Sequence, residues 1–115
     1  MDRKLALPGA RGHPFRLSTR VRNGTAQITV SGEIDIATAP TLEELLIGTM
    51  AGSGSATEVD LANVSFMDAS GLTALIRADN KARDVGGRLQ LSHVPERVSR
   101  LLKISHLDRR FSVLT

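Results

Sequence analysis

One serine lies where a strand-like pattern changes into a helical one. The segment Asp68-Ala69-Ser70-Gly71 follows a mostly apolar stretch, and from Leu72 onward apolar residues recur at helical spacing. A serine hydroxyl in such a turn can attack a substrate, cap the helix or accept a phosphoryl group. These three kinds of chemistry make different demands on the residues around Ser70.

Nucleophilic catalysis by Ser70 has little support in the sequence. The nucleophile elbow requires a glycine two residues before the serine, and Asp68 stands there instead. His93 and His106 are the available bases, but no motif pairs either of them with the serine. We therefore predict that the chain is not an enzyme and has no catalytic residue.

Helix capping by Ser70 or Asp68 is the simplest alternative. Phosphorylation of Ser70 would instead add about 1.5 to 2 negative charges at the start of the helix. The free N–H groups and the dipole of a helix N-terminus tolerate negative charge, so the fold would survive. Asp68 is already negative, so a partner that fits the neutral serine would then meet a dense anionic patch.

Metal and nucleotide sites are not indicated. The chain has no cysteine, and its histidines (His13, His93 and His106) are not spaced as ligand pairs. The glycine-rich run at 52–55 precedes a strand pattern, and it lacks the lysine of a phosphate-binding loop. We expect no metal and no cofactor.

The elements that position these residues begin with a hairpin. Apolar and polar residues alternate over 15–22 and 26–31, which predicts two strands, and Asn23-Gly24 between them is a strong turn signal. Helical spacing and strand patterns then alternate, which predicts an α/β fold. We expect a mixed, mostly parallel sheet that begins with an antiparallel hairpin and carries helices packed on it. The predicted helices cover 38–51, 72–85 and 95–103, and the later strands cover 58–62, 88–92 and 111–114.

The length of 115 residues suggests a single domain. Residues 1–14 contain two prolines, two glycines and four charged residues without periodicity, so we expect a flexible tail there and one domain over 15–115. No run of 18 apolar residues exists, and the N-terminal apolar stretch is too short for a signal peptide. We therefore expect a cytoplasmic protein without a membrane span.

Charge is distributed unevenly along the chain. Residues 1–75 contain 6 basic and 8 acidic side chains, whereas residues 76–115 contain 9 basic and 4 acidic ones. A basic half can indicate nucleic-acid binding, but the chain has only three aromatic residues on which bases could stack. We interpret the basic residues as a solvated surface and expect no direct contact with nucleic acid.

Two segments resemble the STAS domain of anti-sigma factor antagonists. One is Gly32-Glu33-Ile34-Asp35, and the other is Asp60–Leu72, with the letters DLANVSFMDASGL. The predicted order of elements agrees with this family over residues 15–115. Many family members have Ser or Thr directly before the phosphorylated serine, whereas this chain has Ala69. The resemblance implies the STAS fold.

The resemblance also implies a regulatory mechanism. In this family the serine that matches Ser70 is phosphorylated by an anti-sigma factor that has a serine kinase fold and uses ATP. The unphosphorylated antagonist binds the anti-sigma factor and so frees a sigma factor for transcription. The phosphorylated antagonist dissociates from the anti-sigma factor, and a phosphatase removes the phosphate to restore the binding form. The implied partner-binding positions are Asp35, Asp68, Ser70, Gly71 and Thr73.

An alternative function stays open within the same fold. STAS-like modules without phosphorylation act as scaffolds or ligand-binding parts of signalling and transport complexes. Retention of the acceptor Ser70 in this chain favours the phosphorylation switch.

Overall fold

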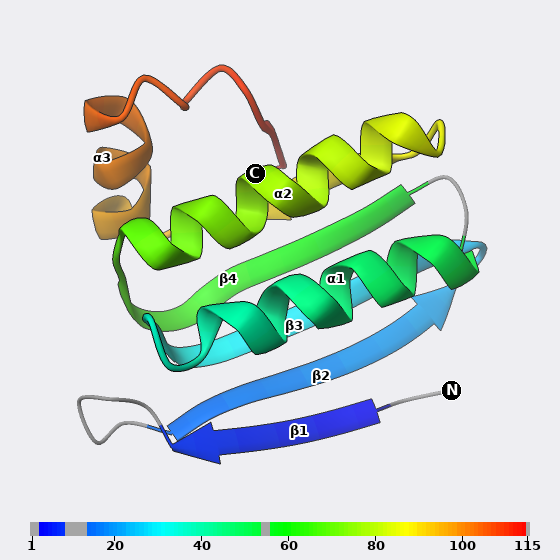
Figure 1. The fold of residues 1–115 in the computed structure, drawn as a ribbon, viewed down its shortest axis with the longest axis horizontal. Coiled ribbons are helices and arrows are strands. Elements are labelled where there is room, and N and C mark those ends of the chain that lie inside the picture. Colours follow the sequence, from blue (N-terminus) through cyan, green and yellow to red (C-terminus); the bar gives the residue numbers. More distant parts are fainter. Residues whose placement is uncertain (1–2, 9–13, 54–55, 115) are drawn as a thin grey trace.

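Six strands form one sheet in chain order in the computed structural model, which describes residues 3–8, 14–53 and 56–114 (Figure 1). β1, β2 and β3 pair antiparallel, and the pairs from β3 to β6 are parallel. Three helices connect the parallel strands, which confirms the predicted α/β fold with a mixed sheet. The elements are β1 (Arg3–Pro8), β2 (Pro14–Arg22), β3 (Thr25–Ile34), α1 (Ala39–Ser53), β4 (Ala56–Met67), α2 (Ala69–Asp84), β5 (Arg88–Ser92), α3 (Glu96–Ile104) and β6 (Ser112–Leu114).

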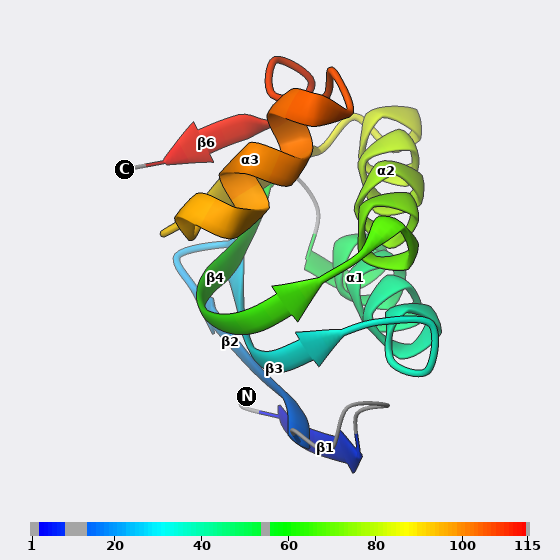
Figure 2. The ribbon, with the colours of Figure 1, turned by 90° about the vertical axis from the view of Figure 1, so that its left-hand side faces the viewer.

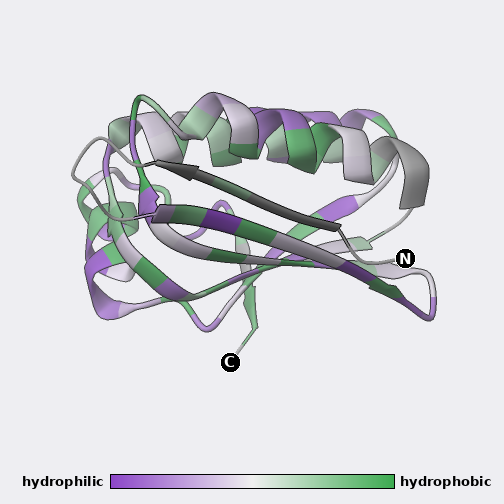
Figure 3. Ribbon diagram, turned by 90° about the horizontal axis from the view of Figure 1, so that it is seen from below, coloured by the Kyte–Doolittle hydropathy of each residue, from purple (hydrophilic) through white to green (hydrophobic). Residues whose placement is uncertain are grey.

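The predicted hairpin joins β2 and β3. Asn23 and Gly24 connect the strands with φ angles of 53° and 78°, which are the left-handed values that a two-residue hairpin turn needs. Hydrophobic and hydrophilic residues alternate along these strands (Figure 3). Phe15 and Leu17 are buried, whereas Arg16 between them is exposed. Every second side chain of the hairpin therefore points into the core.

The core lies between the sheet and two helices. Figure 2 shows α1 and α2 on the same side of the sheet. Their apolar residues recur at helical spacing and face the buried side chains of the central strands. Burial of each such large side chain stabilises the folded state by about 1.5 to 3 kcal/mol. The fully buried members include Leu42, Leu46, Val59, Leu61, Leu75, Leu89 and Leu91.

Helix α3 lies apart from the α1–α2 layer, at the end of the sheet where β4 ends (Figure 1). It begins after Pro95, close to the predicted start, and buries Val98 and Leu102. The guanidinium of Arg97 donates a hydrogen bond to the backbone oxygen of Ser65 in β4. This contact joins α3 to the strand that leads into Ser70.

One prediction about the N-terminus was wrong. The sequence suggested a flexible segment over residues 1–14, but residues 3–8 form β1, which pairs antiparallel with β2 from Arg3↔Thr19 to Pro8↔Pro14. Residues 1–2 and 9–13 of that segment lie outside the described residues. A short edge strand with proline at its end is held by backbone pairing, which sequence periodicity does not reveal.

Two of the boundaries that differ from the prediction concern the serine segment. β4 runs five residues beyond the predicted end at residue 62, because its pairing with β3 continues through two register shifts to Ile34↔Met67. α2 begins at Ala69 rather than at Leu72. Ser70 therefore lies inside the first turn of α2. Within the described residues no helix is both long and apolar enough to cross a membrane.

Candidate functional site

Two loops meet at the carboxyl ends of neighbouring parallel strands. β3 ends at Ile34 and β4 ends at Met67, and these two residues pair in register. The N–H of Asp68 then donates a hydrogen bond of 3.2 Å to the backbone oxygen of Ile34. Because parallel strands end at the same edge, Asp35 follows β3 directly beside the start of the Asp68–Ser70 segment. The fold thus brings together the two segments on which the family resemblance rests.

Asp68, and not Ser70, caps α2. Its carboxylate oxygen Oδ1 accepts a hydrogen bond of 2.8 Å from the N–H of Ser70. Its backbone oxygen accepts from Gly71 and Leu72, which closes the first helical turn. Ser70 is half-buried, and its hydroxyl has no hydrogen-bond partner among the described residues. The hydroxyl is therefore not needed for capping and is available to a partner molecule.

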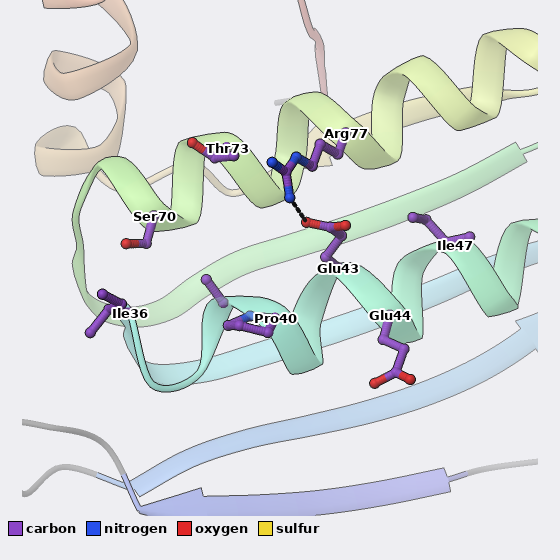
Figure 4. A pocket seen from close by; sticks show the side chains of 9 residues that line it. Ile36, Pro40, Glu43, Glu44, Ile47, Ser70, Thr73 and Arg77 are labelled. Carbon is purple, nitrogen blue, oxygen red and sulfur yellow. Dashed lines mark ion pairs between the residues drawn. The ribbon is translucent and has the colours of Figure 1, made fainter.

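A groove of about 600 Å³ separates the beginnings of α1 and α2, and Ser70 lies on its wall (Figure 4). On the α2 side Ser70, Thr73 and Arg77 follow one another on the same helix face. Arg77 crosses the groove to Glu43, with 3.5 Å between Nη1 and Oε1. The remaining lining comes from the β3–α1 loop and α1, through Ile36, Ala39, Pro40, Glu43, Glu44 and Ile47.

Asp35 shapes the loop that forms one end of this groove. Its Oδ1 atom accepts hydrogen bonds from the N–H groups of Ala37 at 2.9 Å and Thr38 at 3.1 Å. The Thr38 hydroxyl donates to the backbone oxygen of Glu33 and accepts from the N–H of Asp35. Asp35 is only 3% exposed, so its carboxylate holds the loop and is not displayed on the surface.

The Asp35 loop displays an isoleucine that the sequence analysis missed. Ile36 is 77% exposed at the tip of the loop and lines the groove that contains Ser70. Its side chain lies near the Ser70 end of the groove in Figure 4. In the sequence Ile34 and Ile36 continue a strand-like alternation, so Ile36 resembled a core residue. Only the turn at Asp35 exposes it.

Gly71 and Thr73 differ in what they offer a partner. A Cβ atom on Gly71 would lie 2.6 Å from Met67 Cγ and 2.9 Å from Ile34 Cγ2, so Gly71 allows α2 to approach the ends of β3 and β4. Gly71 is buried, whereas Thr73 is exposed on the groove. The Thr73 hydroxyl donates to the backbone oxygen of Ala69 at 3.0 Å.

Among the described residues no histidine lines the Ser70 groove, and no group of side chains suits a metal ion. His93 lies 3.3 Å from Asp60, measured from Nδ1 to Oδ1, and neither His93 nor His106 lines the groove. Among the described residues no three His, Asp or Glu side chains form a group that could hold a metal ion. His13 lies outside the described residues.

A phosphate on Ser70 would change the charge of the groove. Ser70 lies in the first turn of a helix whose N-terminus carries partial positive charge, so a phosphate there is compatible with the helix. Glu44 and Glu43, the latter paired with Arg77, line the same groove, and Asp68 precedes Ser70 by two residues. A phosphate on Ser70 would therefore make this surface much more negative without disturbing the core.

Comparison with known proteins identifies the family. The family described as "Mlab, STAS domain" matches residues 17–115. The anti-sigma-B factor antagonist of Bacillus subtilis (strain 168) is 36% identical over 81 residues, which cover 70% of this chain and 73% of that protein.

Solved structures agree with this match. The structure of an anti-sigma factor antagonist from Mycobacterium paratuberculosis has a TM-score of 0.74 and 26% identity, and covers 96% of this chain and 85% of its own. The Bacillus cell fate determinant SpoIIAA in its phosphorylated form shares the fold, with a TM-score of 0.67 and 22% identity over 88% of this chain and 91% of that one. The chain therefore belongs to the STAS domain family, which includes the anti-sigma-B factor antagonists.

Proposed function

We propose that this protein is an anti-sigma factor antagonist controlled by phosphorylation of Ser70. The unphosphorylated form binds an anti-sigma factor, which releases its sigma factor for transcription in the cytoplasm. The anti-sigma factor is also a serine kinase, and a phosphatase reverses the modification. The observation that carries this proposal is the unpartnered Ser70 hydroxyl on a groove beside the exposed Ile36.

The chemical step belongs to the partner and not to this chain. The Ser70 oxygen attacks the γ-phosphorus of ATP that the kinase holds, and the bond between that phosphorus and the β,γ-bridging oxygen breaks to give ADP. The hydroxyl proton passes to a base of the kinase. This chain supplies an accessible acceptor on a rigid helix turn, so it acts as substrate and binding protein and not as an enzyme.

The binding surface divides into two kinds of residue. Ser70, Thr73 and Ile36 are at least partly exposed along the groove and would contact the partner directly. Asp35 and Gly71 are buried and would act by positioning the loop and the helix that carry those contacts. Removal of an exposed apolar side chain such as Ile36 from water by a partner would favour binding.

Charge repulsion would release the partner. The phosphate would add about 1.5 to 2 negative charges next to Glu43, Glu44 and Asp68. Burial of such a patch against a surface that fits the neutral serine carries a large desolvation penalty. The phosphorylated SpoIIAA structure of Bacillus, with the same fold, supports a modification that leaves the fold intact.

Intact-mass analysis tests the proposal. The purified protein is incubated with ATP and lysate of its source organism, with Ser70→Ala and Thr73→Ala variants in parallel. We expect one phosphoryl group on the wild type and on Thr73→Ala, and none on Ser70→Ala. Thr73 is the matched control, because it is a second hydroxyl on the same groove. Absence of modification, with kinase activity confirmed in the lysate, would favour the scaffold or transport alternative.

A further inference from the structure

A second polar site lies at the opposite end of α2 from Ser70. Asp79 is buried there, with its side chain 5% exposed, and it forms two ion pairs. Its Oδ2 atom lies 3.2 Å from Nε of Arg83, one helical turn further along α2, and 3.2 Å from Nε of Arg110, in the segment between α3 and β6. One buried carboxylate therefore holds two guanidinium groups from distant parts of the chain.

Further hydrogen bonds orient the two guanidinium groups. Arg83 donates from Nη2 to the backbone oxygen of Arg110 at 3.2 Å. Arg110 donates from Nη2 to the side-chain oxygen of Asn80. Each arginine thus donates a hydrogen bond from Nη2 and places Nε in an ion pair with Asp79, although Arg110 Nε and Asp79 Oδ2 form no hydrogen bond. Neither Nη1 atom has a partner among the described residues. These Nη1 donors are held in place before any ligand arrives, which lowers the entropic cost of binding one.

The oriented arginines line a cleft of about 360 Å³. We call it the arginine cleft, and its lining consists of Asp79, Arg83, Gly87, Arg88, Leu89 and Arg110. Arg88 is exposed, and its guanidinium has no ion pair with any residue that the structure describes. The lining carries three positive charges against a single carboxylate, which is almost fully covered. The exposed Asp84 is nearby in sequence but does not line the cleft.

A purely structural role explains only part of this arrangement. The Asp79 ion pairs tie the segment before β6 to α2, and they require only Arg83 and Arg110. They do not account for Arg88 on the same cleft or for the two unused Nη1 groups. The excess positive charge matches the basic character of residues 76–115, of which only Arg77 lines the Ser70 groove among the described basic residues.

We propose that the arginine cleft binds a small anion that carries a phosphate group. Guanidinium groups bind phosphate oxygens through paired, charge-assisted hydrogen bonds, which fits a cleft bordered by three arginines. The volume lies at the lower end of ligand pockets, which span about 300 to 1,000 Å³, and so suits a compact ligand. Arg83 is about 20 Å from Ser70 along the helix, so the cleft is a separate site.

Amide NMR spectra recorded during titration test the proposal. Inorganic phosphate and pyrophosphate are added separately at constant ionic strength, with sodium chloride as the balancing salt. We expect the amide signals of Gly87 and Leu89 to shift and to reach saturation as the anion is added. The two titrations give one dissociation constant for each anion, and these constants show which anion fits better. The Arg88→Gln variant keeps most of the side-chain length and should bind about tenfold more weakly. The Arg22→Gln variant removes another exposed arginine, at the hairpin, and should bind like wild type.

Two results would overturn the proposal. Shifts that do not saturate, or that spread evenly over basic surfaces, would show simple charge screening. Equal weakening by Arg88→Gln and Arg22→Gln would show that only net charge matters. The Ser70→Ala variant should bind phosphate like wild type, so this experiment and the phosphorylation experiment succeed or fail independently.

Discussion

The Asp68 carboxylate accepts a hydrogen bond of 2.8 Å from the N–H of Ser70, two residues further along the chain. This bond assigns the two residues different tasks. Asp68 follows β4 and caps α2, while the Ser70 hydroxyl remains on the groove without a capping role. Stability and switching can therefore be separated by mutation.

Loss of the cap should destabilise the protein. The Asp68→Ala variant leaves an N–H group of α2 without its partner, so we expect a loss of about 0.5 to 2 kcal/mol in the free energy of unfolding. Asp68→Asn should lose much less, because asparagine also caps helices well. Urea unfolding of both variants measures the difference. Equal stability of Asp68→Ala and wild type would show that the cap contributes nothing.

Charge at position 70 should control partner binding. Ser70→Ala should bind the anti-sigma factor like wild type and should resist inactivation by the kinase. Ser70→Asp and the phosphorylated protein should both bind poorly, because the groove already contains Glu43 and Glu44. Calorimetric titration with the purified partner gives the dissociation constants. Tight binding by the phosphorylated protein would rule out the charge mechanism.

Ile36 should contribute to binding and little to stability. It is 77% exposed, so Ile36→Ser should change the free energy of unfolding by no more than about 0.5 kcal/mol. We expect the same change to weaken partner binding by about tenfold or more, since it removes an apolar anchor. Ile104→Ser is the matched control, because Ile104 is 71% exposed at the end of α3, away from the groove. Similar binding by the two variants would contradict the proposed surface.

Two glycine-to-alanine changes should have opposite effects. The methyl group of Gly71→Ala would meet Met67 and Ile34, so we expect a loss of about 1 to 3 kcal/mol in the free energy of unfolding. Gly48→Ala in α1 meets no atom within 4 Å, and we expect a gain of about 0.5 to 1 kcal/mol from helix propensity. Thermal unfolding measures both. A stable Gly71→Ala variant would mean that α2 can shift away from the strand ends at little cost.

Much of the fold follows from patterns that are local in the sequence. The alternation around Phe15 and Leu17 and the turn at Asn23-Gly24 predicted the hairpin, because each depends on neighbouring residues alone. The helical spacing from Leu72 onward likewise predicted most of α2. The strand β1 was missed, because its stability comes from pairing with β2 and not from its own pattern.

The sequence by itself determined the α/β order, the candidate acceptor Ser70 and the family resemblance around it, since these depend on residue types and their spacing. Only the tertiary structure decided which residues are displayed. It buried Asp35 and Gly71, exposed Ile36 beside Ser70, and brought Arg83 and Arg110 to the same carboxylate of Asp79. The physical reason is that exposure and ion pairing depend on contacts between distant segments, which chain spacing does not specify.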